Sequence, residues 1–331
     1  MLGQRCLVAR VEAGGPGGRM RLASVAEGTA ADLRAWRDKK LFKGSQTVLV
    51  LRSDERQFLT IDKPDVPDVD LQKAVRWPLA EALETEAEQL LTTALLLPPI
   101  NPALHPQVLA VAGRLELVRG HLAALDEAGI KARSIDVTDS ALRGMALLNS
   151  RSRNDALGNA MSGANDGWVV LAFIGSDVCI GLLWHGEFCA LRTLSLPVRQ
   201  PRNESEFEEH LALHIQRTVD HFERQATQLS IRHVLASMPS LSVAARESVR
   251  ASLPLSATLF ELEAVFDMSG ATLEHCEGDD DLTALACVAA ARLVDGQLGQ
   301  AAAAASSGAA PSTHGPSTQS PLPVLTAEVA S

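Results

Sequence analysis

Short runs of hydrophobic and polar residues succeed one another along the chain and predict alternating strands and helices. Residues 6–12 and 19–27 alternate with the period of two that is typical of strands, on either side of a glycine-rich turn. A helix pattern follows at about residues 29–41. The continuous apolar run at residues 47–53 predicts a strand that is buried on both faces.

The next helix pattern starts at Asp68 and places an apolar residue at every fourth position as far as Leu83. Pro78 lies inside this pattern, and we expect it to break the helix just after Trp77 because proline has no amide hydrogen. Further strands are predicted at residues 55–64, 91–99, 107–113 and 130–136, and further helices at about residues 115–125 and 138–148.

The second half of the chain opens with a hairpin pattern, in which two apolar runs between residues 167 and 189 flank the turn Ile174-Gly175-Ser176-Asp177. A long amphipathic helix is predicted at residues 207–225. A strand follows at residues 231–237, and helix and strand patterns then alternate as far as residue 295. Both halves therefore indicate an α/β architecture with mixed sheets.

Two segments without hydrophobic periodicity divide the chain. Residues 151–167 are polar and glycine-rich, and we interpret them as a linker between a first domain at 1–150 and a second at 168–296. Residues 297–331 consist mainly of Ala, Ser, Pro, Gly and Thr with almost no charge, and this composition predicts a disordered tail.

The amino-acid composition excludes one class of binding partner. The 331 residues carry a net charge of −10 and contain 8 Phe, 4 Trp and no Tyr. A phosphate backbone would be repelled by this charge, and few aromatic rings are present to stack on bases. We therefore exclude nucleic acid as the main partner.

The number of cysteines and the hydropathy indicate the cellular compartment of the protein. Five cysteines without a C-x-x-C pair are typical of a reducing compartment. No apolar stretch reaches the ~18 residues of a spanning helix. We expect a cytoplasmic protein that is at most peripheral to a membrane.

Two groups of residues contain patterns that are found in metal sites. His185 and Glu187 form an H-x-E pattern, but the P-C-x-x-C that completes a deaminase zinc site is missing. His210, His214 and His221 share one side of a helix without forming H-E-x-x-H. We therefore expect no metal site.

Asp136 ends a strand just before a helix, where catalytic carboxylates often lie in α/β folds. It is equally suited to accept hydrogen bonds that help Thr138 and Asp139 to cap the next helix, and we favour that interpretation. No catalytic residue is assigned.

Several segments together resemble the MshI family of mannose-sensitive haemagglutinin (MSHA) pilus biogenesis proteins, and more loosely PilM of type IV pili. One is FLTIDKPDVPDVDLQKAVRWPLAEAL, which contains a D-x-P-x-V-P turn and an A-x-x-W helix. A second runs from residue 108 to 148, with an A-G-[IL] turn and an I-D motif. The hairpin at residues 167–197 and the helix at 210–225 complete the match, which covers about residues 5–295. The residues that match these motifs are Asp62, Pro64, Val66, Pro67, Ala74, Trp77, Arg217 and Phe222.

The resemblance implies an actin-like fold, with two ribonuclease H-like domains around a cleft and a small α/β subdomain inserted in the first domain at about residues 54–128. It also implies a protein at the cytoplasmic face of the inner membrane. Proteins of this kind bind the N-terminal cytoplasmic tail of a PilN-like bitopic partner and contact other pilus assembly components.

The nucleotide motifs of actin-like ATPases are each altered in this chain. The first phosphate loop is expected to be absent, because residues 6–12 resemble the family's second strand. The D-x-G of the second domain's hairpin reads Phe173-Ile174-Gly175, without the carboxylate. The Gly-Gly pair that admits adenosine is replaced by Ala, Ser, Met and Pro at residues 236–239. We therefore expect a non-catalytic scaffold without a cofactor.

Three hypotheses of function remain open from the sequence. The first is a pilus scaffold whose partner-binding residues are Arg76 and Trp77, although for Trp77 alone burial in the core is the better interpretation. The second is an ATPase that binds ATP and Mg²⁺ through Gly175, Ser176 and Asp177 with Asp136. The third is the cytoplasmic part of a GspL-type secretion component, which shares the fold.

Overall fold

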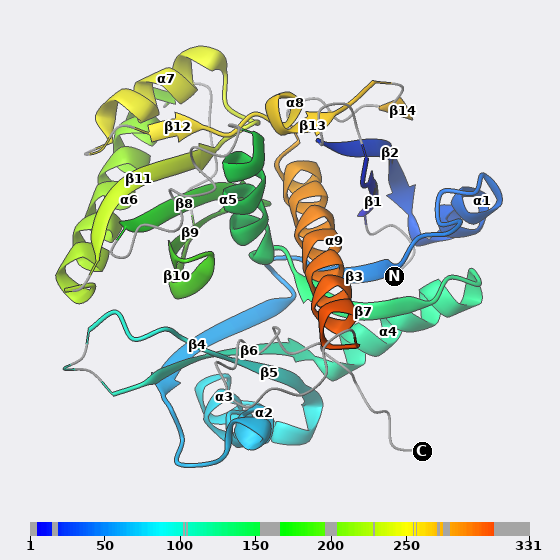
Figure 1. The fold of residues 1–331 in the computed structure, drawn as a ribbon, viewed down its shortest axis with the longest axis horizontal. Coiled ribbons are helices and arrows are strands. Elements are labelled where there is room, and N and C mark those ends of the chain that lie inside the picture. The colour runs from blue at the N-terminus through cyan, green and yellow to red at the C-terminus, as the bar shows by residue number, and fades with distance from the viewer. Residues whose placement is uncertain are drawn as a thin grey trace.

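The computed structural model describes residues 5–14, 19–101, 103, 105–152, 166–195, 204–227, 229–253, 255, 257–269, 272–273 and 279–307. The chain forms several sheets and helices that alternate along the sequence (Figure 1). Most of the predicted linker and residues 308–331 of the predicted tail lie outside the described residues. In the described chain, no helix is both long and apolar enough to cross a membrane.

The first sheet is built on the N-terminal hairpin. Strand β1 (Arg5–Glu12) pairs antiparallel with β2 (Met20–Thr29), and β13 (Phe266–Asp267) and β14 (Thr272–Leu273) pair with the other edge of β2. A separate parallel pair consists of β3 (Thr47–Leu51) and β7 (Ala132–Val137). The helices of this part are α1 (Leu33–Asp38), α4 (Leu115–Glu127) and α5 (Ser140–Ser152).

A three-stranded sheet within residues 54–128, the range predicted for the insert, has a core of its own. Its antiparallel order is β4 (Arg56–Asp62), β6 (Gln107–Arg114) and β5 (Leu90–Leu96). Helices α2 (Leu71–Ala74) and α3 (Arg76–Ala82) pack on one face and bury Leu71, Val75 and Leu79 against it (Figure 1).

The second half of the chain forms a five-stranded sheet with helices on both faces. The order is β10 (Glu187–Ser195), β9 (Asp177–Trp184), β8 (Asp166–Ile174), β11 (Ser230–Ser237) and β12 (Ala257–Leu259). Alternate residues of β8 face α6 (Glu204–Gln225) and α7 (Val243–Ser252) on one side. The others face α5, α8 (Leu262–Val265) and α9 (Asp280–Ser307) on the opposite side.

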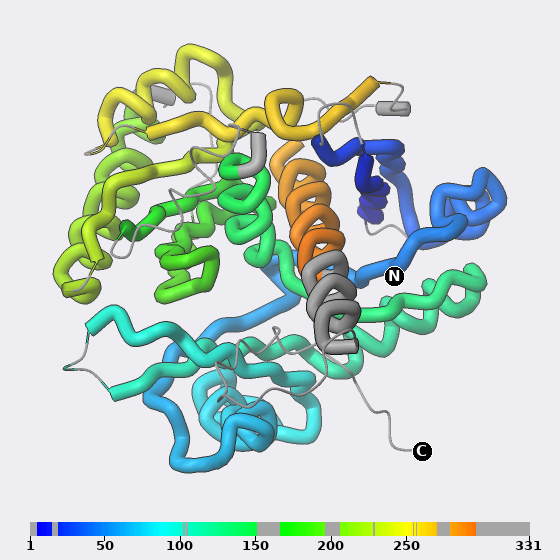
Figure 2. The backbone as a smooth tube through the Cα atoms, in the orientation of Figure 1, coloured from blue at the N-terminus to red at the C-terminus, as the bar shows by residue number. Residues whose placement is uncertain are grey.

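Helices α5 and α9 lie side by side in the middle of the molecule, between this sheet and the N-terminal hairpin (Figures 1 and 2). Two ion pairs hold α9 in place. Arg292 binds Asp136 at the end of β7, and Arg143 of α5 binds Asp295, each with nitrogen–oxygen distances of 2.6 to 3.1 Å. Strands β13 and β14 pair with β2, and α9 packs on β1, so residues from the C-terminal third of the chain contact the first sheet.

The helix around Pro78 is interrupted earlier than its sequence predicts. The break lies at Val75, between α2 and α3, and not after Trp77. A proline ring clashes with the carbonyl four residues before it, which here belongs to Ala74, so the distortion falls one turn upstream. Pro78 itself fits within the first turn of α3, where a missing amide hydrogen costs little.

Two other expectations differ from the structure. The apolar strand β3 is not buried on both faces, because four of its five residues remain half-exposed. Helix α9 continues to Ser307, through the first part of the predicted tail. Alanine is the strongest helix former, and residues 301–305 are all alanine.

Candidate functional site

The turn between β8 and β9 is closed by one of the protein's own carboxylates. Gly175 adopts a φ of 61°, which suits glycine, and its amide donates a hydrogen bond of 2.9 Å to Oδ1 of Asp281. Asp281 lies in the first turn of α9. Ser53, just after β3, is also close, because its Oγ lies 3.3 Å from where a Cβ would stand on Gly175. A carboxylate therefore occupies the position in which this amide could bind a phosphate oxygen.

A second layer of charge surrounds that carboxylate. The guanidinium of Arg5, at the start of β1, binds Asp281 at 3.2 Å and also pairs with Asp279 and Glu27. Burial raises the pKa of Asp281, and the charge of Asp279 raises it further. An incoming phosphate would meet clustered carboxylates whose arginine is already shared among three of them.

The loop after β11 is tied to the same helix end. The amide of Ser240 donates a 3.1 Å hydrogen bond to Oδ1 of Asp280. Ser240 follows residues 236–239, which replace the Gly-Gly pair that the resemblance associates with adenosine. The Gly175 turn and the loop after β11 are therefore both hydrogen-bonded to the N-terminal turn of α9.

Because of Asp280, we expect the stability of the folded chain to depend on pH. Burial raises the pKa of Asp280 to about 6, although the hydrogen bond from Ser240 favours the ionised form. Because the folded chain holds this proton more tightly than the unfolded chain, its contribution to stability is present at low pH and is lost as the pH rises through about 6. Asp280→Asn keeps an acceptor for Ser240 and removes the ionisation. We expect the variant to be about 1 to 2 kcal/mol more stable than the parent at pH 7, after allowance for solvent screening.

Urea unfolding between about pH 3 and pH 8 measures this effect. The difference between Asp280→Asn and the parent should become small near pH 3, where the aspartate is mostly protonated in both the folded and the unfolded chain. A difference of constant size at every pH would contradict the assignment. Asp126→Asn, an exposed carboxylate in α4, serves as the control.

Asp136 is engaged by the protein and not directed at the Gly175 turn. Its Oδ1 accepts hydrogen bonds from the Val137 amide at 2.8 Å and from Ser140 Oγ at 2.5 Å, and its Oδ2 binds Arg292 at 2.6 Å. Among the described residues, no hydrogen bond or ion pair joins it to Gly175, Ser176 or Asp177. The side chain acts as a junction between β7, α5 and α9.

Phe173 lies where the actin-like pattern has an acid. Its side chain is buried in the core between β8 and α6, with Phe207 and Leu211 in the same cluster. The next residues, Gly175 and Ser176, form the exposed turn. The aromatic ring is therefore part of the core and does not face the turn.

The sequence analysis did not predict a buried ion pair between β4 and the residue that precedes α5. Arg56 and Asp139 are 5% and 1% exposed, and two nitrogen–oxygen contacts of 2.6 and 2.7 Å join them. Burial alone would lower the pKa of Arg56, but the hydrogen bonds and charge of Asp139 raise it. The guanidinium also lies 4.5 Å from the centre of the Phe58 ring. Asp139 was expected to cap α5, and only the fold shows that it meets a residue 83 positions away.

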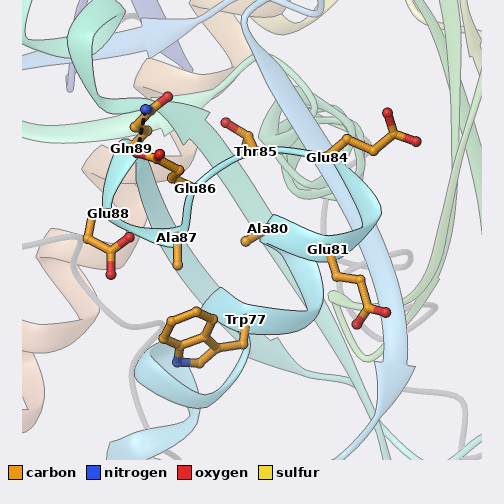
Figure 3. Close-up of a pocket in the computed structure, with 9 residues that line it drawn as sticks. All are labelled: Trp77, Ala80, Glu81, Glu84, Thr85, Glu86, Ala87, Glu88 and Gln89. Carbon is orange, nitrogen blue, oxygen red and sulfur yellow. Dashed lines mark hydrogen bonds between the residues drawn. The ribbon is translucent and has the colours of Figure 1, made fainter.

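Trp77 is exposed, which corrects the expectation that it belongs to the core. Its side chain is 67% exposed and lines a surface cavity of about 740 Å³ (Figure 3). Its ring lies on the same side as Ala80 and Ala87 (Figure 3). The neighbouring Arg76 is half-buried, and its Nε has no hydrogen-bond partner in the described chain. We call the residues that line this cavity the Trp77 surface: Trp77, Ala80, Glu81, Glu84, Thr85, Glu86, Ala87, Glu88 and Gln89.

The Trp77 surface combines an aromatic ring with negative charge. Four of its residues are glutamates, and none of them forms an ion pair with an arginine or lysine in the part of the chain that the structure describes. An exposed aromatic ring beside carboxylates that have no arginine or lysine partner in the described chain is suited to a peptide that carries apolar and basic side chains.

The histidines do not form a metal centre in the described part of the chain. His210 and His214 face each other with Nε2 atoms 3.0 Å apart, and desolvation and the charge of His210 lower the pKa of His214. His221 instead contacts the ring of Phe222. His185 belongs to the turn between β9 and β10, with a φ of 52°. No group of three or more possible ligands lies together within the described residues.

Comparison with known proteins rests on structure, because no family model and no curated protein matches this sequence. A solved structure titled PilM-PilN type IV pilus biogenesis complex matches with a TM-score of 0.58 and 19% identity, over 86% of this chain and 95% of that chain. A Bacteroides thetaiotaomicron protein described as having an actin-like ATPase fold matches with a TM-score of 0.43 and 9% identity, over 78% of this chain and 88% of that one. This chain has an actin-like fold.

Within this fold, the cytoplasmic domain of EpsL is another structural neighbour. EpsL is an inner membrane component of the Vibrio cholerae type II secretion system, and the match has a TM-score of 0.45 and 10% identity, over 88% of this chain and 95% of that one. The prediction of an actin-like architecture is confirmed by the fold that this chain shares with the PilM-PilN structure over most of both chains.

Proposed function

We propose that the chain is a non-catalytic cytoplasmic scaffold of a type IV pilus assembly machine of the MSHA type. In this proposal it is peripheral at the inner membrane and binds the N-terminal cytoplasmic tail of a PilN-like bitopic protein. The observation that carries the proposal is the likeness, over most of both chains, to a structure of a PilM-PilN complex. The motifs at residues 58–83 and 108–148 support the MSHA type.

The Trp77 surface is the proposed contact for the partner's tail. It combines the solvent-exposed ring of Trp77 with carboxylates that lack cationic partners among the described residues. Tryptophan is enriched among the residues that dominate binding energy at interfaces. The four glutamates favour a tail that carries lysine or arginine beside an apolar residue.

An ATPase of the same fold is the alternative function. It requires phosphate binding at Gly175, whose amide instead donates to Asp281. Asp279 lies two residues before Asp281, and both carboxylates already pair with Arg5. Displacing these contacts would oppose binding of a negatively charged nucleotide, so we favour the scaffold.

Calorimetry with a synthetic peptide of the PilN-like protein's N-terminal tail tests the scaffold. We expect binding to the full chain, and a loss of affinity of at least about thirtyfold in Trp77→Ala, as for other central aromatic residues of interfaces. Val243→Ala is the matched control, because Val243 is 68% exposed but lies in α7, on the other half of the molecule. Absence of heat with the parent chain would refute the partner, and equal loss in both variants would refute the Trp77 surface.

Titration with fluorescent ATP and Mg²⁺ tests the alternative. The scaffold predicts no binding at micromolar concentrations. Micromolar binding that is weakened by Asp177→Ala or Asp136→Ala would favour the ATPase. Because peptide and nucleotide are titrated separately, the two hypotheses can fail independently.

A further inference from the structure

The charged residues of helix α6 are divided between two sides of the helix. At about 100° per residue, its two arginines and three histidines from residue 210 onward fall within about 80° of one another. The described acidic residues of α6 lie on the remaining surface, with the exception of Glu206 in the first turn. One side of this helix is therefore basic, although the chain as a whole is acidic.

Arg192 of β10 adds a further charge to the basic side of α6. Desolvation lowers the pKa of His214. The positive charges of His210, Arg217 and Arg192 lower this pKa further, so the neighbouring charges that act on His214 are all positive. We call this cationic patch, which comes from two elements, the α6 basic flank: Arg192, His210, His214, Arg217, His221 and Arg224.

The arginines of the α6 basic flank are not neutralised by the protein. Arg192, Arg217 and Arg224 are exposed, and none of them forms an ion pair with a described residue. By contrast, the two arginines of the neighbouring helix α7 both bind glutamates. Because the chain carries a net charge of −10, unpaired cations gathered on one flank indicate a negatively charged binding partner.

The form of the flank suits an extended surface. From His210 to Arg224 it follows α6 for about 21 Å. Helix α6 lies on the face of the five-stranded sheet that is opposite α5 and α9 (Figure 1). Leu213, which is exposed, borders the flank on the helix surface. An apolar side chain beside basic ones is typical of helices that lie against the headgroup region of a membrane.

We propose that the α6 basic flank binds the phosphate headgroups of an anionic phospholipid surface. The guanidinium fork of arginine pairs with phosphate oxygens through two hydrogen bonds. Each arginine near an anionic membrane strengthens binding about fivefold, so the three arginines together give about a hundredfold. The net charge of −10 repels such a surface from the rest of the molecule, and the contact therefore fixes which side of the protein faces the lipid.

Sedimentation with lipid vesicles tests the proposal on the full chain. At low salt, we expect the protein to bind phosphatidylglycerol vesicles at least about ten times more strongly than phosphatidylcholine vesicles, and added salt should weaken this binding by screening. Arg217→Glu with Arg224→Glu should lower the binding at least about tenfold. Equal binding of the parent chain to the two lipids would overturn the proposal.

Arg119→Glu with Lys131→Glu is the matched control. It changes the net charge by the same amount at two exposed residues of the first half, which have no ion pair in the described chain. We expect it to leave the binding to phosphatidylglycerol vesicles within about twofold of the parent. An equal loss in the two pairs of variants would overturn the proposal, because net charge alone would then explain the binding.

An acidic protein segment is the competing occupant, and poly-glutamate is its probe. Calorimetric binding of poly-glutamate that depends on Arg217 and Arg224, without any binding to phosphatidylglycerol vesicles, would overturn the proposal in favour of a protein partner. The lipid contact goes beyond the proposed function, because it does not involve the tail of the PilN-like protein. Trp77→Ala should leave vesicle binding unchanged, so the lipid contact and the tail contact can fail independently.

Discussion

Replacing Arg56 by methionine is expected to destabilise the protein by about 3 to 5 kcal/mol, because the substitution leaves the buried carboxylate of Asp139 without its cation. Asp139 is 1% exposed and Arg56 5%, so water cannot take the place of either partner. The pair also joins β4 to the start of α5, and the Arg56 guanidinium contacts Sγ of Cys179 in β9 at 3.6 Å. Urea unfolding followed by circular dichroism measures the loss.

Two further variants separate the ion pair from the loss of a side chain. Arg52→Met removes an arginine that is 44% exposed and paired with exposed Asp54, so we expect a change within about 0.5 kcal/mol. The double variant Arg56→Met with Asp139→Leu removes both charges and should recover much of the stability. A small effect of Arg56→Met alone would show that Asp139 finds another partner or is protonated.

Much of the architecture could be predicted from the sequence, because local patterns determine local structure. The strands β1, β2, β4 and β6 begin and end within one or two residues of the predicted runs. Helix α4 begins at Leu115 as predicted and is followed by the turn at Gly129, which has a φ of 71°. These features depend on the period of hydrophobic residues and on the conformational freedom of glycine. Both can be recognised from a few neighbouring residues.

The candidate sites depended on contacts that no local pattern reveals. Asp281 lies 106 residues from Gly175 and Arg292 lies 156 from Asp136, and nothing in the intervening sequence predicts that they meet. Trp77 was expected to be buried because it is a large aromatic residue within a helical pattern. After the break at Val75, α3 buries Leu79 and Ala80. Trp77 lies on the other side of this helix and faces solvent.

Helix α9 links these observations. Its first turn binds the Gly175 turn through Asp281, its middle packs on α5, and Arg292 and Asp295 fix it to β7 and α5. Carboxylates at the N-terminal end of α9 also bind Arg5 at the start of β1. Helix α9 therefore connects the N-terminal hairpin, β7, α5 and the Gly175 turn.

Replacing Gly144 by alanine is expected to cost about 3 kcal/mol, because α5 and α9 approach too closely for a methyl group. A Cβ on Gly144 would lie 2.2 Å from the carbonyl oxygen of Cys287 and 2.7 Å from its carbonyl carbon. These are backbone atoms of a buried helix, so relief requires that the whole of α9 shifts. Differential scanning calorimetry should show a lowered unfolding temperature.

Gly120→Ala supplies the matched control for this variant. Gly120 also lies in a helix interior, within α4, and is half-buried. There alanine's better helix propensity should dominate and stabilise the chain by about 0.5 to 1 kcal/mol. A stabilising effect of Gly144→Ala of the same size would contradict the close packing of α5 on α9.

If Gly144→Ala is destabilising, it should also accelerate hydrogen exchange at the Gly175 amide, because the shift of α9 displaces Asp281 from the turn.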